Sequence, residues 1–264
     1  MDSYILVSTY ETVQKIIEMI QKKQGGIYLR YGDGDFNILL GQYDMLANPT
    51  PDFQHWMRES MKISDDSVLT SIPHHCKEMG TLEEGMCGGN HEYPLHMFQR
   101  FIQHISTFHV PSRLYSSVAL CYCASHFPDT VIELHQQIKM NNVMYIGNTM
   151  YSNEFLSTLF GTSLDQIHVP QRDSFLEHDR VFSEFDAMYQ QKYKSLDFFV
   201  IIMAAGCGGR AFSGELYSKY YQHKRNFFIL DYGSLLDCLW GYQSRAYMEI
   251  DPPKTEYILS SLSN

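Results

Sequence analysis

The hydrophobic and polar positions of this chain follow two periods, one helical and one typical of strands. Apolar residues recur at helical spacing within residues 9–24, where a Gly-Gly pair ends the pattern, and again within 52–63 and 94–108. The apolar runs at 27–32 (IYLRYG) and 66–73 (DSVLTSIP) predict strands, the first followed by a polar, glycine-rich loop.

From residue 142 onward, strands and helices alternate regularly. Four apolar segments predict strands, at 142–148, 166–170, 196–206 and 226–233. Three segments between them predict helices, at 152–161, 177–193 and 212–221, the first with Ser152 as its N-cap. This alternation predicts an α/β fold with a mostly parallel sheet and helices on both faces. Ligands are then expected at the carboxyl ends of the strands.

The size and charge of the chain limit the classes of partner. With 264 residues, 44% of them hydrophobic, it can bury one substantial core, and we expect a single domain, 1–264, with a loop insertion at 74–94. The formal charge of −10, from 20 basic and 30 acidic residues, argues against a nucleic-acid partner. An anionic small molecule is still compatible with this net charge as a ligand, because helix N-termini, single arginines or a bound cation can hold a phosphate.

Targeting and membrane segments are not evident in the sequence. The N-terminus has no basic region followed by an apolar core, and no apolar run reaches the ~18 residues that cross a bilayer. The sequence therefore predicts a cytoplasmic protein with no transmembrane segment and with reduced cysteines, Cys121 and Cys123 among them as buried thiols. It leaves the oligomeric state open, a homo-oligomer included.

The sharpest local feature is the motif RYGDGD at 30–35, at the end of the first predicted strand. Asp33 and Asp35, separated by one glycine, can approach one hard cation, and Mg²⁺ or Mn²⁺ prefers such oxygen ligands. A metal there would offset charge on a departing nucleoside diphosphate. Asp and Gly are also typical of an ordinary turn, and for a D-G-D fragment alone an ordinary turn is more frequent than a metal site.

A second glycine-rich motif, GCGGRA at 206–211, lies between a predicted strand and a predicted helix. It matches the pattern G-x-G-x-x-A, in which backbone N–H groups at a helix N-terminus hold a phosphate, and Arg210 would add charge. Asp231, at the end of the next strand, could then bind a ribose. These features support an alternative, an enzyme that uses NAD or S-adenosylmethionine. A tight turn that needs glycine only for packing explains the motif equally well.

The predicted loop at 74–94 concentrates histidine and cysteine. Its candidate zinc ligands are His74, His75, Cys76, Cys87 and His91, although their spacing matches no standard zinc motif and an ordinary loop is the more frequent case. His74 or His75 could instead accept a proton from an acceptor hydroxyl, because histidine titrates near neutral pH.

Several segments, in one order along the chain, resemble the bacterial GT-D glycosyltransferases, a family first described as a domain of unknown function. YLRYGDGDF resembles the family's strand and R-F/Y-G-D-G-E motif, VLTSIP its next core strand, and NVMYIGNTMYSNEFLSTLFG its strand, glycine turn and helix. FFVIIMAAGCGGRAFSGELY resembles its apolar strand and G-P-T-A-K-type turn, and NFFILDYGSLLD its D-I/L-G-H-L-D ending. The resemblance covers most of residues 26–240.

The resemblance implies a Rossmann-like GT-D fold and a glycosyltransferase. Such an enzyme moves a sugar from a nucleoside diphosphate sugar, often a UDP-sugar, to a hydroxyl of a glycan or glycoconjugate, with Mn²⁺ or Mg²⁺ held here by Asp33 and Asp35. The chain departs from the family's motifs at Asp35, where the family has Glu, at Arg210, where it has Lys, and at Ser234, where it has His.

Position in the predicted sheet and resemblance together assign the site residues. The catalytic candidates are Asp33, Asp35 and His74, with Asp173 as a further candidate base. The residues expected to bind the nucleotide sugar are Arg30, Gly32, Gly34, Asn148, Arg172, Gly206, Gly208, Arg210 and Asp231. A noncatalytic module that only binds a nucleotide sugar is a third alternative, because Asp35 and Ser234 depart from the family's motifs.

Overall fold

The computed structural model describes residues 5–63, 65–72, 113–221, 226–242 and 250–263 of the chain. Within these ranges one sheet of eight strands has the order β1-β4-β3-β2-β8-β7-β5-β6, and every pairing is parallel. The strands are β1 (Ile5–Leu6), β2 (Gly26–Arg30), β3 (Val68–Ile72), β4 (Arg113–Ser116), β5 (Asn142–Gly147), β6 (Leu164–His168), β7 (Phe199–Ala204) and β8 (Phe227–Asp231). The predicted α/β fold with a parallel sheet is confirmed.

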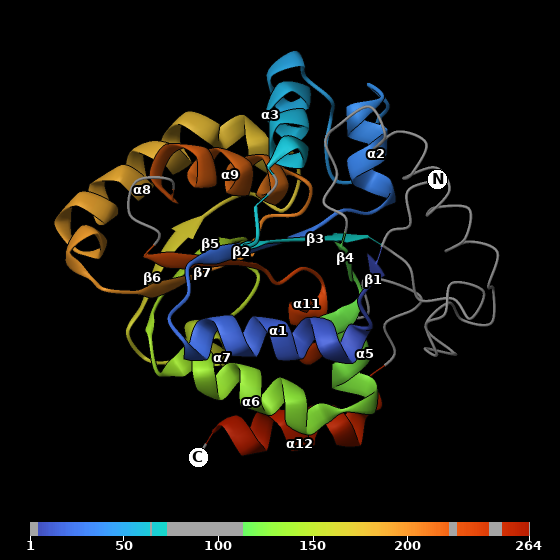
Figure 1. Ribbon diagram of the computed structural model, residues 1–264, viewed down its shortest axis with the longest axis vertical. Helices are drawn as coiled ribbons and strands as arrows, with labels where there is room; N and C mark the ends of the chain where they lie inside the picture. The colour runs from blue at the N-terminus through green and yellow to red at the C-terminus, as the bar shows by residue number, and fades with distance from the viewer. Residues whose placement is uncertain (1–4, 64, 73–112, 222–225, 243–249, 264) are drawn as a thin grey trace.

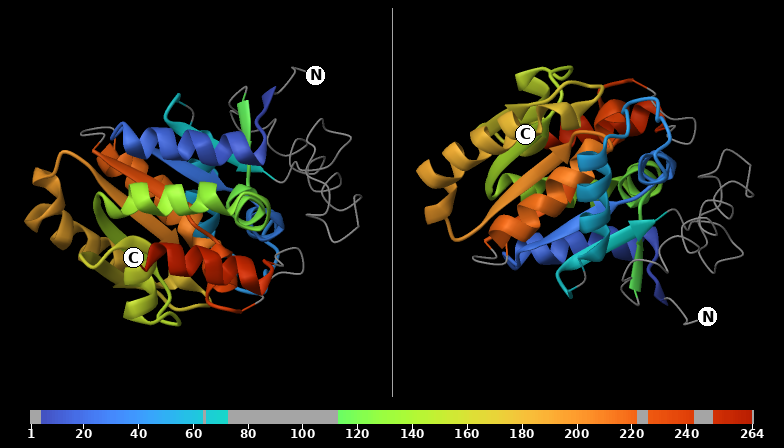
Figure 2. Two further views of the ribbon diagram at one scale, coloured as in Figure 1. Left: turned by 90° about the horizontal axis from the view of Figure 1, so that it is seen from below. Right: turned by 90° about the horizontal axis from the view of Figure 1, so that it is seen from above.

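Helices cover both faces of this sheet (Figure 1). One face carries α2 (Asp33–Leu39), α3 (Pro51–Lys62), α8 (His178–Gln191) and α9 (Gly208–Leu216). The other carries α1 (Thr9–Gln21), α5 (Ala119–His126), α6 (Pro128–Lys139), α7 (Asn153–Phe160), α11 (Leu235–Leu239) and α12 (Pro252–Leu262). Figure 2 shows this second layer face on, with α1, α6 and α12 side by side. In the described part of the chain, no helix has the length and apolar character that crossing a membrane requires.

Local capping explains where two of the predicted helices begin. At the start of α1, the hydroxyl of Ser8 accepts the backbone N–H of Glu11 at 3.2 Å, and the carboxylate of Glu11 accepts the N–H of Ser8 at 3.2 Å. Ser152 caps α7 as predicted, since its hydroxyl accepts the N–H of Phe155 at 3.2 Å.

The structure differs from the sequence-based assignment at several elements. The predicted glycine-rich loop after β2 is wrong, because α2 begins there at Asp33. The sequence patterns did not identify β1, β4, α5, α6, α11 or α12. α5 buries Cys121 and Cys123 as thiols that form no disulfide with a described residue, in agreement with the expectation. The loop predicted at 74–94 and the helix predicted at 94–108 lie outside the described residues.

The connections change face at two places in the sheet, at β5, which leads into α7 beside β7 and its helix α9, and at β8. The neighbours of β8, β2 and β7, lead into α2 and α9 on one face, whereas β8 itself leads into α11 on the opposite face. In open parallel sheets, ligands bind where successive connections leave in opposite directions, just beyond the carboxyl ends of the strands. The topology therefore favours a binding site beyond the carboxyl ends of β5, β7 and β8.

Candidate functional site

The two carboxylates of the RYGDGD motif lie on the first turn of α2. Asp35 accepts the backbone N–H of Gly32 through Oδ2 at 2.8 Å, which fixes the helix start, and Asp33 accepts the N–H of Gly34 at 2.9 Å. Asp33 is exposed, whereas only 2% of Asp35 is. The motif is thus a rigid helix start rather than the flexible turn expected from its glycines, and its two carboxylates face different environments.

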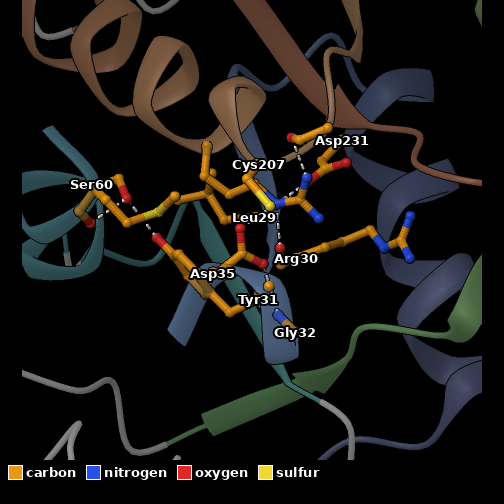
Figure 3. A network of polar contacts seen from close by, with 12 residues as sticks. Leu29, Arg30, Tyr31, Gly32, Asp35, Ser60, Cys207 and Asp231 are labelled. Carbon is orange, nitrogen blue, oxygen red and sulfur yellow. Dashed lines mark hydrogen bonds and ion pairs between the residues drawn. The ribbon is translucent and has the colours of Figure 1, made fainter. Parts of the chain in front are cut away.

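Asp35 lies beside Arg210 of α9 and Asp231 of β8, which come from distant parts of the sequence. Nε of Arg210 is 3.4 Å from Oδ1 of Asp35 and 3.1 Å from Oδ2 of Asp231. Its single hydrogen is donated to the carbonyl oxygen of Arg30 at 2.6 Å, so the two carboxylate oxygens have no hydrogen-bond donor among the described residues. Figure 3 shows Asp35 and Asp231 approaching the same region from different elements.

A second guanidinium, that of Arg30, holds three strand ends together. Nε of Arg30 donates to the carbonyl oxygen of Ser117 at 2.6 Å, and Nη1 donates to that of Tyr232 at 3.2 Å. These carbonyls directly follow β4 and β8, and only 7% of Arg30 is exposed. Gly233 has a φ of +59°, and a Cβ atom there would collide with Nη1 of Arg30. Arg30 therefore joins the ends of β2, β4 and β8.

Glycines near the motif are required by close packing of neighbouring segments. A Cβ atom on Gly34 would lie 2.8 Å from Oδ1 of Asp44 and 3.1 Å from Sγ of Cys207. Likewise, a Cβ atom on Gly208 would collide with the hydroxyl of Ser174. From the sequence, Gly34 and Gly208 were assigned to contacts with the nucleotide, and their packing against Asp44, Cys207 and Ser174 could not be predicted. The geometry supports close packing as the reason for glycine at both positions.

The turn at 206–208 is not laid out as an open dinucleotide-binding loop. Gly206 is exposed with a φ of +57°, but Cys207 and Gly208 are buried. Sγ of Cys207 lies 4.0 Å from Oδ2 of Asp44, and the hydroxyl of Ser174 donates to the carbonyl of Ala205 at 2.7 Å. Cys207 and Gly208 are therefore packed against the segments that carry Asp44 and Ser174, in agreement with the packing explanation of this motif.

Burial and charge act on the site in opposite directions. Desolvation raises the pKa of Asp35 to about 6, although the positive charge of Arg210 and the N–H of Gly32 act to lower it. Burial acts to lower the pKa of Arg210, but the charges of Asp231 and Asp35 outweigh this effect and raise it above its ordinary value. Arg210 is therefore a permanent cation next to a carboxylate that is costly to ionise.

The site as a whole has more acidic than basic groups. Four carboxylates and two guanidinium groups gather beyond β2, β7 and β8, so carboxylates are in excess when all groups are ionised: Asp33, Asp35, Asp44 and Asp231 against Arg30 and Arg210. A diphosphate would add further negative charge. The bare cluster would therefore repel it without an additional cation.

The donor set fits the divalent cation expected from the sequence. In the described ranges no group of three His, Cys, Asp or Glu side chains could hold a metal ion. Mg²⁺ does not need one, because it commonly binds through one or two carboxylates together with phosphate oxygens and water. Oδ1 of Asp35, buried without a hydrogen-bond donor, is an oxygen suited to such a site, and exposed Asp33 lies two residues before it on the first turn of α2.

Two predicted site residues form hydrogen bonds with residues outside this cluster. Arg172 is exposed and its guanidinium donates to the hydroxyl of Tyr43 at 2.5 Å, while Oδ1 of Asn148 accepts the N–H of Met150 at 2.9 Å. No hydrogen bond or ion pair in the described residues joins either of them to Arg210. His74, the third catalytic candidate, lies outside the described residues, as do the candidate zinc ligands.

Asp173, the further candidate base, is occupied in holding a loop. Its two carboxylate oxygens accept from Asn48 at 2.7 to 3.2 Å, and its N–H donates to the carbonyl of Leu46 at 2.8 Å. Asp173 has a φ of +53°, unusual for a residue other than glycine. It therefore fastens the loop that carries Asp44 rather than facing the charged cluster.

Comparison with known proteins identifies the fold but not a sequence family. No family model and no curated protein matches the chain. A solved structure described as a new glycosyltransferase (DUF1792) from Streptococcus sanguinis is similar with a TM-score of 0.66 and 13% identity, over 96% of this chain and 92% of that one.

Two further solved structures agree with this result. One is described as the domain of unknown function 1792, with a TM-score of 0.66 and 12% identity. The other is described as that domain with a distinct glycosyltransferase fold, with a TM-score of 0.65 and 11% identity. Both similarities cover 97% of this chain and 90% of the other. This chain therefore has the fold of the DUF1792 glycosyltransferase domains.

Proposed function

We propose that this protein is a glycosyltransferase that moves a sugar from a nucleoside diphosphate sugar, with a UDP-sugar as the first candidate, to a hydroxyl of a glycan or glycoconjugate. The observation that carries the proposal is the buried charged cluster of Asp35, Arg210 and Asp231 at the carboxyl end of β8. It lies within the region where this sheet topology favours ligand binding, in a fold shared with structures described as glycosyltransferases.

Arg210 is the residue best suited to hold the donor diphosphate. A guanidinium has five N–H donors, of which Arg210 uses one for the carbonyl of Arg30 and one for that of Gly206. The remainder have no acceptor among the described residues, and 13% of the side chain is exposed. Arg210 also lies in the first turn of α9, where the helix dipole favours an anion.

Asp33 and Asp35 would hold Mn²⁺ or Mg²⁺ beside the diphosphate. When bound, such an ion offsets the charge that develops on the departing nucleoside diphosphate. The excess of carboxylates in the cluster supports this assignment, because the residues alone leave the site negative. Arg30 and Gly233 would keep the ends of β2 and β8 in register around the donor.

The acceptor hydroxyl needs a group that takes its proton if the reaction inverts configuration. The candidate bases are Asp35, His74 and Asp173. Asp173 is less suited because both of its carboxylate oxygens already accept from Asn48, and Asp35 is less suited because it is buried beside Arg210. His74, at the carboxyl side of β3 in the sequence, stays the predicted base.

A thermal-shift screen tests this function. The purified protein would be heated with UDP-, GDP- and TDP-sugars, NAD and S-adenosylmethionine, each with Mn²⁺ or EDTA. A ligand at about a hundredfold excess over its dissociation constant stabilises the folded state by about 2.7 kcal/mol. We expect one nucleotide sugar to stabilise the protein in Mn²⁺, with a smaller effect in EDTA and in Asp33→Ala. Stabilisation by NAD or S-adenosylmethionine alone, independent of metal and of Asp33, would reject the proposal.

A further inference from the structure

Arg210 occupies the position between two buried carboxylates where a cation is required. Asp35 and Asp231 are each only 2% exposed, so their charges are poorly screened by water. The oxygens that face Arg210, Oδ1 of Asp35 and Oδ2 of Asp231, have no hydrogen-bond partner among the described residues. Arg210 is therefore the positive charge between these two buried carboxylates, and the buried guanidinium of Arg30 adds a second positive charge that acts on Asp231.

The contact between Arg210 and this pair is one of charge rather than of hydrogen bonds. Nε lies 3.1 Å from Asp231 and 3.4 Å from Asp35, but its hydrogen is directed to the carbonyl of Arg30. Strong Arg–carboxylate pairs are commonly bidentate, with two N–H donors aligned on two oxygens. Here neither carboxylate receives such a bond. Another cation could replace the guanidinium without breaking any hydrogen bond to these carboxylates.

The same guanidinium is also the best phosphate donor of the site, and these two tasks conflict. A diphosphate is attracted to Arg210 but repelled by the adjacent carboxylates. A divalent cation at Asp33 and Asp35 would neutralise the carboxylates and remove the need for Arg210 at that position. Its unused N–H donors would then serve the diphosphate.

We propose that Arg210 and a divalent cation compete for the carboxylate of Asp35, and that Arg210 turns from Asp35 to the donor diphosphate when the cation binds. The inference rests on the proposed function and adds to it an order of events at the same site. Arg210 acts as a placeholder cation in the ligand-free protein, so that the site stays folded without metal. Asp231 acts as a positioning residue for Arg210 rather than as a ribose ligand.

If Arg210 and the cation compete, substitution of Arg210 should strengthen the binding of the cation and weaken the binding of a nucleoside diphosphate. In Arg210→Gln, Mn²⁺ measured alone by electron paramagnetic resonance should bind at least about fivefold more tightly, the effect of one unit charge about 4 Å away even at the dielectric constant of water. In the same variant, UDP, GDP or TDP in Mn²⁺ should bind at least about tenfold more weakly, because charge-assisted bonds to phosphate are lost. A side chain with a merely structural role would weaken both.

Arg180→Gln is the matched control. Arg180 lies on α8, with 42% of its side chain exposed, in ion pairs with Glu177 and Glu184. This variant removes the same charge from the protein and should leave both affinities within about twofold of the wild type, since exposed pairs are screened.

A measurement on the wild type covers the case in which Arg210→Gln does not fold. The Nε–H resonance of Arg210, identified by its absence in Arg210→Lys, should shift on addition of Mg²⁺ alone. No shift at saturating Mg²⁺, weaker Mn²⁺ binding in Arg210→Gln, or no Mn²⁺ binding to either protein would each overturn the inference. If no nucleoside diphosphate binds the wild type with or without Mn²⁺, the proposed function fails instead.

Discussion

Single residues of the site are constrained by contacts that reach across the sheet, and Gly233 shows this most directly. Substitution Gly233→Ala should destabilise the protein, because its φ of +59° is strained for alanine and the new Cβ would displace Nη1 of Arg30. Gly241→Ala is the control, since Gly241 has a φ of +85° but a Cβ atom added there would meet no described atom within 4 Å.

Both substitutions carry the backbone strain of about 1 kcal/mol, and only Gly233→Ala should add about 1–3 kcal/mol for a buried hydrogen bond to a charged group. Chemical denaturation of the two variants measures the difference. Equal losses of unfolding free energy would mean that the contact between Gly233 and Arg30 contributes nothing.

A second residue, His135, makes stability depend on pH. It is fully buried, with Nδ1 2.8 Å from the carbonyl of Leu159 and Nε2 2.7 Å from the hydroxyl of Tyr232, and burial lowers its pKa from 6.5 to about 4. Because the folded-state pKa lies below the unfolded one, the unfolded chain takes up the proton first as pH falls. The contribution of neutral His135 is therefore present above pH 6.5 and is lost as pH falls toward about 4.

Comparison with His135→Gln, which keeps a donor and an acceptor but does not titrate, isolates this effect. Between pH 7 and 4 the unfolding free energy of the wild type should fall relative to that of the variant, by up to about 3 kcal/mol. Parallel pH profiles for the two proteins would show that His135 does not titrate differently in the two states.

At the scale of elements, α2 is the instructive difference between sequence and structure. Its first residues, Asp33 and Gly34, are typical of turns, which is why a loop was expected. Burial of Phe36, Ile38 and Leu39 against the core outweighs this local preference and makes the segment helical. Local composition therefore located the carboxylates but not the helix that orients them.

Gly34 gives a test of how tightly α2 is packed. Alanine is intrinsically about 1 kcal/mol better than glycine inside a helix, yet its Cβ at this position would lie 2.8 Å from Asp44 and 3.1 Å from Cys207. We expect Gly34→Ala to lower the free energy of unfolding in spite of this preference, because overpacking costs about 1–3 kcal/mol.

A double-mutant cycle with Asp44→Ala identifies the cause. Removing the Asp44 carboxylate should relieve part of the collision, so the loss caused by Gly34→Ala should be smaller in the Asp44→Ala background. If the two losses of unfolding free energy are additive, the cost of Gly34→Ala does not come from the collision with Asp44.

At the scale of the whole molecule, the sequence predicted the parallel architecture well where strands and helices alternate, after residue 142. It missed β4 and α5, because a four-residue strand and a helix that is apolar on most sides have no clear period. It also missed α6, although Val131, Leu134 and Ile138 follow a helical spacing there. The same limit applies to the site. Arg210 and Asp35 were each identified within a separate motif, but only the order of the strands brings them together across the sheet.

The most direct test of the central claim is a crystal structure with the sugar nucleotide that gives the largest thermal shift in Mn²⁺. The diphosphate should lie beyond the carboxyl end of β8, within hydrogen-bond distance of the guanidinium of Arg210, with the cation at Asp33 and Asp35. A nucleotide bound elsewhere, for example beside Arg172 and Asn148 without contact to Arg210, would contradict the assignment of the site.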